Sequence, residues 1–434
     1  MKKLIALALS LCIFGGTAPA TVEYIGDISL AASAATVVDS GTCGENITWV
    51  LDDEGTLTIS GTGDMTDYSY GEETPFSMNK EIKNAVIENG VTNIGERAFS
   101  FCYNLESVTI PSSVTSIKSE AFYFCPSLTS ITIPDSVTSI GDYAFEFCSS
   151  LRSITLPASV IIGECVFLDC DQLETISVDE NNKAYKSVNG ILFDKNMTEI
   201  ICFPAGKIDT SYAIPGSVKS IGYMAFFKCK NLESVSIPST VTSIGDGAFS
   251  GCENLRSISI PESITRLKGT FSRCKSLESV TVPASVSTVD DWTFAYCENL
   301  RSVIIMNPNC SIGNSNTTVF NGYDENNKIY FNGIIYGYEG STAQAYAEKY
   351  GYTFRSLGES PISNVLGDVD GNEIVDGRDA SLVLTHYALI STQQAGIIEE
   401  LYLSNADWDQ NGIVDGRDAS GILTYYAEQS VNKS

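Results

Sequence analysis

The chain has 434 residues, of which 43% are hydrophobic, and its 26 Lys and Arg against 53 Asp and Glu give a formal net charge of −27 at pH 7. This length predicts more than one structural unit. The charge argues against a nucleic-acid partner, because phosphates require Lys and Arg for neutralisation. The single histidine, His386, leaves almost nothing from which to build a histidine-dependent triad or a histidine-rich metal site.

The first residues predict an export signal. Two lysines precede an apolar run, 4–14, and small residues follow it up to the sequence APA at 18–20. This is the order of a secretory signal peptide, and the run is shorter than the roughly 20 residues that span a bilayer. We predict a signal peptide at 1–20, with a second cleavage point near Ala34 as the alternative, and therefore a secreted, extracellular protein that does not span a membrane.

A repeat of 22 or 23 residues runs through the middle of the chain. Its phrase is V-T-S-I-G-x-x-A-F-x-x-C-x-x-L-x-S-I-x-I-P, which takes the form VTSIGDYAFEFCSSLRSITLP from Val137 and VTSIGDGAFSGCENLRSISIP from Val241. A fixed period of this length is typical of a solenoid in which each unit stacks on the next.

Within each repeat, the alternation in L-x-S-I-x-I predicts a short, half-buried strand. Stacked copies should form a parallel sheet along one face, with Leu105, Val108 and Ile110 pointing inward. Ala98 and Phe99 should fill the same coil from the other side. Proline closes each strand, because it cannot donate the next ladder hydrogen bond.

One cysteine occupies the same place in eight repeats: Cys102, Cys125, Cys148, Cys170, Cys229, Cys252, Cys274 and Cys297. Cysteines in an exported chain normally suggest disulfides. Because these recur with the repeat, we predict buried thiols with a packing role instead. Four more lie off this ladder, and the sequence leaves their pairing open: Cys43, Cys165, Cys202 and Cys310.

The repeat is interrupted once. The spacing from Cys170 to Cys229 is 59 residues, which is not a whole number of repeats. The intervening sequence NNKAYKSVNGILFDKNMTEIICFPAGK, from Asn181, alternates apolar residues around Asn-Gly and Asp-Lys-Asn, a pattern that predicts an inserted hairpin near 179–207.

These repeats resemble the BspA-like class of leucine-rich repeat. The segment SGTCGENITWVLDDEGTLTISGTGDM before them and IIYGYEGSTAQAYAEKYGYTF after them resemble the segments that flank such arrays. The resemblance implies a leucine-rich repeat solenoid with a parallel β-sheet, short strands and helical turns at 86–325. A β-rich N-terminal cap would occupy 38–85 and a C-terminal cap 326–358. It says almost nothing about a ligand.

The predicted sheet face is dominated by hydroxyls, such as Ser107 and Thr109, and lacks the aromatic platforms that a sugar-binding face usually has. The interpretation that these residues solubilise the sheet is therefore favoured. One stripe differs: Phe101, Phe124 and Phe147 precede the cysteine in three consecutive coils. If the rings project, they form a candidate ligand stripe; packing between coils is the alternative explanation.

After a linker at 359–366, the region 367–434 contains one acidic phrase twice, DVDGNEIVDGRDAS and DWDQNGIVDGRDAS. Oxygen donors at positions 1, 3, 5, 7, 9 and 12, with an apolar anchor at position 8 (Val375 and Val414), are what calcium requires. We predict two calcium ions. The ligands would be Asp368, Asp370, Asn372, Ile374, Asp376 and Asp379 in the first loop, and Asp407, Asp409, Asn411, Ile413, Asp415 and Asp418 in the second.

One helical pattern follows each loop, ASLVLTHYA and ASGILTYYA. A loop with a single helix, present twice, resembles the type I dockerin, a small α-helical module with two EF-hand-like loops. The resemblance implies calcium-dependent binding to a cohesin domain of a scaffoldin. The implied contacts are Gly377, Arg378, Leu384, Thr385, Gly416, Arg417, Leu423 and Thr424.

Together with the resemblances, these features predict a secreted, non-catalytic component of a cellulosome, held at the cell surface through its scaffold, and the dockerin family implies polysaccharide breakdown as its context. The repeats would bind a protein or a carbohydrate-associated target. Two alternatives stay open. A hydrolase needs only two suitably placed carboxylates, although no pair stands out from the repeats. A surface adhesin or protein inhibitor would use the Phe101, Phe124 and Phe147 stripe.

Overall fold

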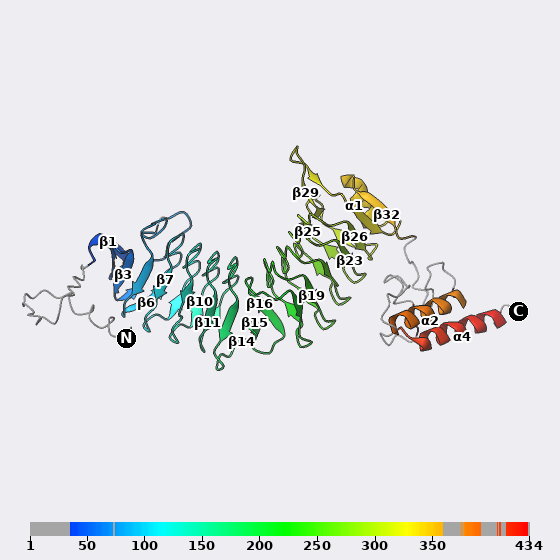
Figure 1. The fold of residues 1–434 in the computed structure, drawn as a ribbon, viewed down its shortest axis with the longest axis horizontal. Coiled ribbons are helices and arrows are strands. Elements are labelled where there is room, and N and C mark those ends of the chain that lie inside the picture. Colours follow the sequence, from blue (N-terminus) through cyan, green and yellow to red (C-terminus); the bar gives the residue numbers. More distant parts are fainter. Residues whose placement is uncertain are drawn as a thin grey trace, which may run out of the picture. The chain divides into compact units, whose positions relative to one another are not determined.

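The computed structural model of the protein describes residues 35–72, 74–358, 375, 377–391, 406, 408 and 414–432. The described part begins with a three-stranded antiparallel meander that leads into stacked coils (Figure 1). Its strands continue as one sheet into the first coils. In order of pairing these strands are β1 (Val37–Gly44), β2 (Ile47–Asp52), β3 (Thr56–Gly61), β5 (Asn84–Ile87), β7 (Ser107–Thr109) and β9 (Ser130–Ile131).

Each coil contributes a second strand as well, which the sequence reading missed. This second ladder is parallel and uses the V-T-S-I part of the repeat, where Val137 and Ile140 are buried and the two residues between them are exposed. In the first half of the array its strands are β4 (Gly63–Asp64), β6 (Val91–Ile94), β8 (Ser116–Ile117), β10 (Ser139–Ile140) and β12 (Ile161–Ile162). A two-residue strand is too short to give a period-two signal.

The interruption is an antiparallel meander. β14 (Tyr185–Val188) pairs with β15 (Ile191–Asp194), and β15 pairs with β16 (Glu199–Cys202). β16 then pairs in parallel with the second ladder of the following coils, which contains β18 (Ser220–Ile221) and β20 (Ser243–Ile244). Before the meander, β11 (Ser153–Leu156) pairs with β13 (Thr175–Val178).

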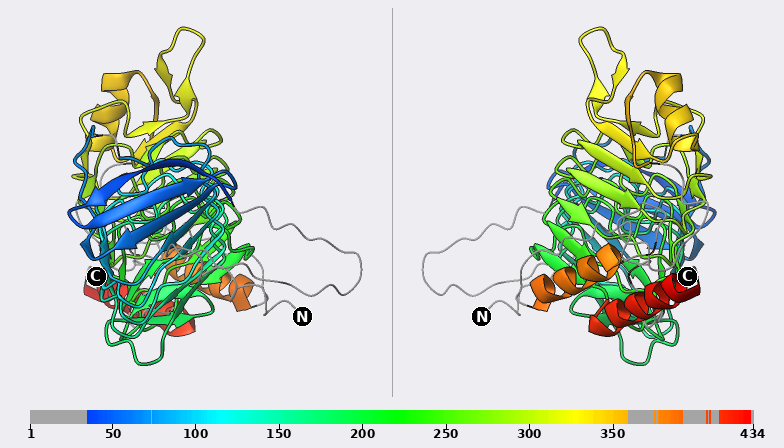
Figure 2. Two further views of the ribbon diagram at one scale, coloured as in Figure 1. Left: turned by 90° about the vertical axis from the view of Figure 1, so that its left-hand side faces the viewer. Right: turned by 90° about the vertical axis from the view of Figure 1, so that its right-hand side faces the viewer.

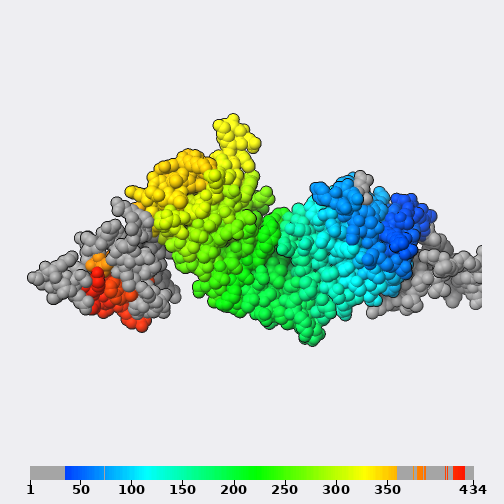
Figure 3. All heavy atoms as spheres, turned by 180° about the vertical axis from the view of Figure 1, so that it is seen from behind, coloured from blue at the N-terminus to red at the C-terminus, as the bar shows by residue number. Residues whose placement is uncertain are grey.

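The coils after the meander repeat both ladders. The first ladder continues as β17 (Ser211–Ala213), β19 (Ser234–Ser236) and β21 (Ser257–Ile258), then as β23 (Ser279–Val282) and β26 (Ser302–Ile305). The second continues as β22 (Arg266–Leu267), β24 (Thr288–Val289) and β27 (Ser311–Ile312). Coils adjacent in sequence are therefore adjacent in space, as the unbroken order of colours along the surface in Figure 3 shows.

The last coils end in a mixed cap. β31 (Ile334–Gly337) and β32 (Thr353–Ser356) extend the first ladder, and α1 (Thr342–Tyr350) covers them (Figure 2). Ser341 caps α1 by accepting a hydrogen bond from the Gln344 amide, and Gly351 ends it at φ 71°. The remaining short strands are β25 (Phe294–Ala295), β28 (Val319–Phe320), β29 (Gly322–Tyr323) and β30 (Ile329–Tyr330).

The core is a set of stacked side-chain rows, as the alternation of the repeat predicts. Leu105, Val108 and Ile110 are buried, and Phe99 is fully buried behind them. The buried phenylalanines stack from coil to coil with ring centroids 5.2 to 6.2 Å apart in the first block of coils and 4.9 to 5.8 Å apart in the second. The meander lies where two apolar clusters adjoin and contributes to both, Leu192 to the first and Phe193 to the second.

The C-terminal region contains two helices, α2 (Gly377–Ser391) and α4 (Gly416–Asn432), which pack against each other. Their shared core is small and consists of Ala380, Val383, Ala406, Ala419 and Ile422. Every helix in the part of the chain that the structure describes is too short or too polar to cross a lipid bilayer.

Candidate functional site

The turns of the coils are not helical, which corrects the expectation of helical turns. The described coil residues between 84 and 312 contain no helix. The reason is that each regular turn contains two residues with positive φ, for example Tyr143 at 57° and Phe147 at 60°, and an L-residue in that region cannot continue a right-handed helix. In place of helical hydrogen bonds, the amides of Tyr143, Phe145 and Phe147 donate to the next coil, to the carbonyls of Glu164, Val166 and Leu168.

The eight repeat cysteines are free and buried. Each thiol donates to the carbonyl oxygen of the buried phenylalanine one coil earlier, as Cys125 does to Phe99 at 3.1 Å and Cys252 to Phe226 at 3.1 Å. The prediction of buried packing thiols is therefore confirmed for Cys102, Cys125, Cys148, Cys170, Cys229, Cys252, Cys274 and Cys297. Burial also raises the pKa of the Cys125 and Cys148 thiols.

The aromatic stripe is half-buried and packs on itself. Phe101 and Phe124 lie 5.7 Å apart between ring centroids, and Phe124 and Phe147 lie 5.0 Å apart. All three adopt positive φ, and the Tyr123 ring meets Phe101 and Phe147 edge-on at 5.4 and 5.6 Å. The rings therefore pack between coils and also keep part of their surface open to solvent, and the ligand stripe stays a prediction.

A cavity of about 590 Å³ adjoins this stripe and includes residues that the sequence reading missed. Tyr70, which is 91% exposed, lies under the Arg97 guanidinium at 5.7 Å, and Arg97 makes an ion pair of 2.5 Å with Glu120. Across the cavity, burial raises the pKa of Glu146 to about 7, with smaller contributions from Asp169 and Glu120. Tyr70 precedes the repeats, so the repeat pattern could not identify it as a candidate site residue.

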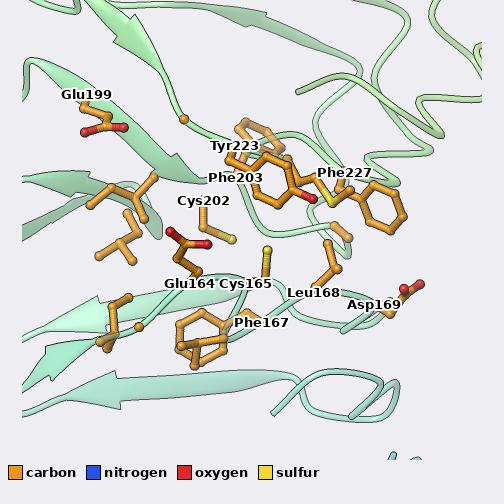
Figure 4. A pocket seen from close by; sticks show the side chains of 18 residues that line it. Glu164, Cys165, Phe167, Leu168, Asp169, Glu199, Cys202, Phe203, Tyr223 and Phe227 are labelled. Atoms are coloured by element: carbon orange, nitrogen blue, oxygen red, sulfur yellow. The ribbon is translucent and has the colours of Figure 1, made fainter. Parts of the chain in front are cut away.

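A second cavity, of about 250 Å³, lies where the two blocks meet (Figure 4). In a regular coil, four residues separate the second-ladder isoleucine from the buried phenylalanine, as residues 141–144 do between Ile140 and Phe145. After the meander only two residues, Ile201 and Cys202, separate Ile200 from Phe203. The turn is two residues short, and this shortage leaves the space that the cavity occupies.

Coils on either side of the shortened turn contact each other directly. Lys228 makes an ion pair with Asp169, and Lys230 makes another with Asp171 at 3.1 Å. Asp169 and Lys228 hold the same place in their coils as Phe147, the residue before the repeat cysteine. These two pairs join the two blocks along the outer side of the gap.

The cysteines off the ladder are free thiols in the structure: Cys43 and Cys310 are buried, and Cys165 and Cys202 are half-buried. Cys165 and Cys202 both line the 250 Å³ cavity, and Figure 4 shows their side chains extending into it from opposite coils. Burial raises the pKa of each to about 12.

In the helical pair, the two halves place equivalent residues in equivalent environments. Ala380 and Val383 of α2 are buried, as are Ala419 and Ile422 of α4. Of the residues implied in cohesin binding, Leu384 is 47% exposed and Leu423 44% exposed, and Arg417 and Thr424 are exposed. Gly416 begins α4 and is half-buried. The backbones of Gly377, Arg378 and Thr385 lie in α2, and the side chains of Arg378 and Thr385 are outside the described part.

The two halves differ around one tryptophan. Trp408 packs against α4 beside Gly421 and Tyr425, with 5.4 Å between the rings of Trp408 and Tyr425. In α2 the residue equivalent to Gly421 is Leu382, and the one equivalent to Tyr425 is His386. His386 is buried, and that burial lowers the pKa of its imidazole.

Most of the predicted calcium ligands lie outside the described residues: Asp368, Asp370, Asn372, Ile374, Asp376, Asp407, Asp409, Asn411 and Ile413. Asp379 and Asp418, at position 12 of each loop, are fully buried, and Asp418 accepts a hydrogen bond of 2.7 Å from the Asp415 amide. Within the described part, no three His, Cys, Asp or Glu side chains come together as a metal site.

Comparison with known proteins identifies the family. The model of the BspA-type leucine-rich repeat region matches residues 72–196 and 202–323, more than half of the chain. A leucine-rich repeat protein from Eubacterium ventriosum is 34% identical over 62% of this chain and 78% of its own, with a TM-score of 0.56. The pneumococcal vaccine antigen PcpA is 20% identical over 74% of this chain and 98% of its own, with a TM-score of 0.52, and shares the fold alone. No curated protein matches. The protein belongs to the BspA-type leucine-rich repeat family.

Proposed function

We propose that the protein is a secreted, non-catalytic component of a cellulosome. Its C-terminal region would act as a dockerin that binds a scaffoldin cohesin when calcium is present, while the repeats bind a protein partner. The observation that carries this proposal is an acidic loop followed by a helix, present twice. Most equivalent positions of the two helices are buried or exposed alike. In both, an alanine and a branched residue are buried, and a leucine is exposed.

Calcium fits the residues that the structure describes. Asp379 and Asp418, at position 12 of the two loops, are fully buried at the starts of α2 and α4, and a cation beside them would favour their charged form. Val375 and Val414, the predicted anchors, pack against the shared core. When bound, the ion would offset the repulsion between clustered carboxylates. The core of the two helices is so small that their folding should depend on the ion.

The test is a binding experiment on the full chain against a panel of cohesin domains, with calcium and with a chelator. We expect calcium-dependent binding that disappears when residues 366–434 are deleted. The variant Leu384→Ala with Leu423→Ala removes only exposed side chains, so it should weaken binding at least tenfold while the helices stay folded. Absence of binding to any cohesin, although calcium increases the helical circular dichroism, would rule out the scaffold role.

A surface adhesin or protein inhibitor is the second candidate, because the aromatic stripe retains exposed surface beside a cavity of about 590 Å³. Replacing Phe101, Phe124 and Phe147 together by asparagine, which tolerates positive φ, should abolish capture of a protein partner and leave the buried core intact. A hydrolase is less favoured, since no pair of carboxylates stands out from the repeat pattern in the sequence. Incubation of the full chain with plant cell-wall polysaccharides and an assay for released sugar tests that alternative.

A further inference from the structure

The shortened turn leaves a gap in the cross-coil hydrogen-bond ladder. In regular coils three amides of each turn donate to three carbonyls of the next turn, as Met224, Phe226 and Lys228 do to Asp246, Ala248 and Ser250. The amides at the same three places in the coil before the gap belong to Cys165, Phe167 and Asp169. Within the described residues, none of these three amides donates a hydrogen bond.

The carbonyls on the far side of the gap are also short of donors. Of the three that should accept, only Ala225 does so, from the Phe203 amide at 2.7 Å. The Tyr223 carbonyl accepts nothing in the described part, and Phe227 has only a long contact of 3.9 Å from the Cys229 thiol. Buried backbone groups normally find partners. The cross-coil ladder therefore lacks hydrogen bonds on both sides of the gap: the amides before it have no acceptors, and two of the three carbonyls after it have no backbone donor within the described residues.

The side chains around the gap are mainly apolar. Phe167, Phe203, Phe227 and Met224 line the 250 Å³ cavity, together with the thiols of Cys165 and Cys202 (Figure 4). Unpaired donors on one wall, at alternate residues, and unpaired acceptors on the other match the alternation of carbonyl and amide along a polypeptide. The carboxylates of Glu164, Asp169 and Glu199 also line the cavity and can accept hydrogen bonds from sugar hydroxyls, so a sugar is the competing ligand in the test below.

We propose that this gap is a peptide-binding site, in which a short stretch of a partner protein's backbone takes the place of the two missing residues. Its carbonyls would accept from the amides of Cys165 and Phe167, and its amide would donate to the Tyr223 carbonyl. The cavity is smaller than the roughly 300–1,000 Å³ of pockets for drug-sized ligands, so two or three small residues are the largest fit. This inference rests on the proposed role of the repeats in binding a protein, and it names the site.

The first test needs no ligand. Hydrogen exchange of the full chain, read with single-residue resolution, should show the amides of Cys165 and Phe167 exchanging at least tenfold faster than those of Tyr143 and Phe145. These are the same positions one coil earlier, where both amides are hydrogen-bonded. Equal protection of the two sets would mean that the rung is already filled, and the proposal would be wrong.

The second test uses N-acetyl-trialanine amide as the probe at millimolar concentration. It should slow exchange at Cys165 and Phe167 saturably and leave Tyr143 and Phe145 unchanged. Cellotriose at the same concentration should change neither set. Protection by cellotriose and not by the peptide would overturn the assignment to a peptide.

A variant that restores the regular turn provides the control. Replacing Ile201 and Cys202 by Gly-Asp-Tyr-Ala, the sequence of residues 141–144, should fill the gap, protect the two amides without any probe and reduce peptide binding at least tenfold. Should this variant fail to fold, Ala205→Trp fills the same cavity, and Ala158→Trp, at a half-buried alanine elsewhere, is its matched control. Undiminished peptide binding in a folded, filled variant would refute the site. Cohesin binding, measured in parallel, reports the C-terminal module separately.

Discussion

The two blocks of coils share a backbone but differ at one surface position. The residue before the repeat cysteine has positive φ in both, between 58° and 61° for Phe101, Phe124 and Phe147 and between 54° and 76° for Lys228, Gly251 and Arg273. In the first block its side chain is an aromatic ring in these three coils and an aspartate at Asp169, and in the second block it is basic, absent or, at Tyr296, aromatic. The buried rows, by contrast, are the same in both blocks. The turn therefore fixes the backbone and leaves this side chain free to vary.

The largest expected effect tests the shared core. Phe122→Ala in the first block and Phe249→Ala in the second each remove a fully buried ring that stacks on both neighbours. Each should lower the free energy of unfolding by about 3–5 kcal/mol. Because contacts in a solenoid are made with neighbouring coils, peptide-level hydrogen exchange should speed up mainly in the block that carries the change. Equal acceleration in both blocks would mean that they unfold as one unit.

The comparison between α2 and α4 gives the next prediction. A Cβ at Gly421 would lie 2.2 Å from Cδ1 of Trp408, so Gly421→Ala should destabilise the helical pair by about 1–3 kcal/mol through overpacking. Alanine has the higher helix propensity, and an exposed site would show the opposite sign. Thermal unfolding followed by the helical circular dichroism measures the change, with Ser420→Ala as the control. A stabilised variant would show that Trp408 moves aside freely.

The sequence predicted those parts of the fold that repeat. Leu105, Val108, Phe99 and the cysteine ladder lie where the period places them, because each makes the same contact in every coil. The second strand ladder was missed because two residues cannot display a period. The unpaired amide of Cys165 follows from a turn that is two residues short. The shortage can be recognised in the sequence only once the strand pairing of Ile200 with Ile221 is known. The 590 Å³ cavity depends on Tyr70, a single loop residue that no pattern identifies.

A pH effect separates the acidic first block from the second. Burial, Asp169 and Glu120 raise the pKa of Glu146 to about 7 in the folded chain, above its unfolded value of about 4.3. The folded state thus holds the proton more tightly, and stability should fall as pH rises from about 4.5 to 7 and then level off. Because solvent screens a half-exposed carboxyl, we expect a loss of about 1 kcal/mol.

Urea unfolding at several pH values measures this loss. Glu146→Gln should remove that part of the pH dependence, whereas Glu278→Gln, at an exposed position of the second block, should retain it. An unchanged pH profile in Glu146→Gln would assign the effect to another group.

The smallest expected effect is a difference in the rate of thiol alkylation between the ladder cysteines and the two cysteines at the gap between the blocks. Ladder thiols such as Cys125 and Cys252 are fully buried and donate to a carbonyl, whereas Cys165 and Cys202 are half-buried at a cavity. Only the thiolate is alkylated, and a pKa of about 12 makes both gap thiols slow at pH 8. Because the reagent can reach the cavity, Cys165 and Cys202 should nevertheless react before the ladder thiols.

Mass spectrometry after iodoacetamide treatment of the native chain should find Cys165 and Cys202 modified before any ladder cysteine, and trialanine should slow that modification. Modification of Cys125 or Cys252 first would mean that the coils open more readily than the gap admits reagent.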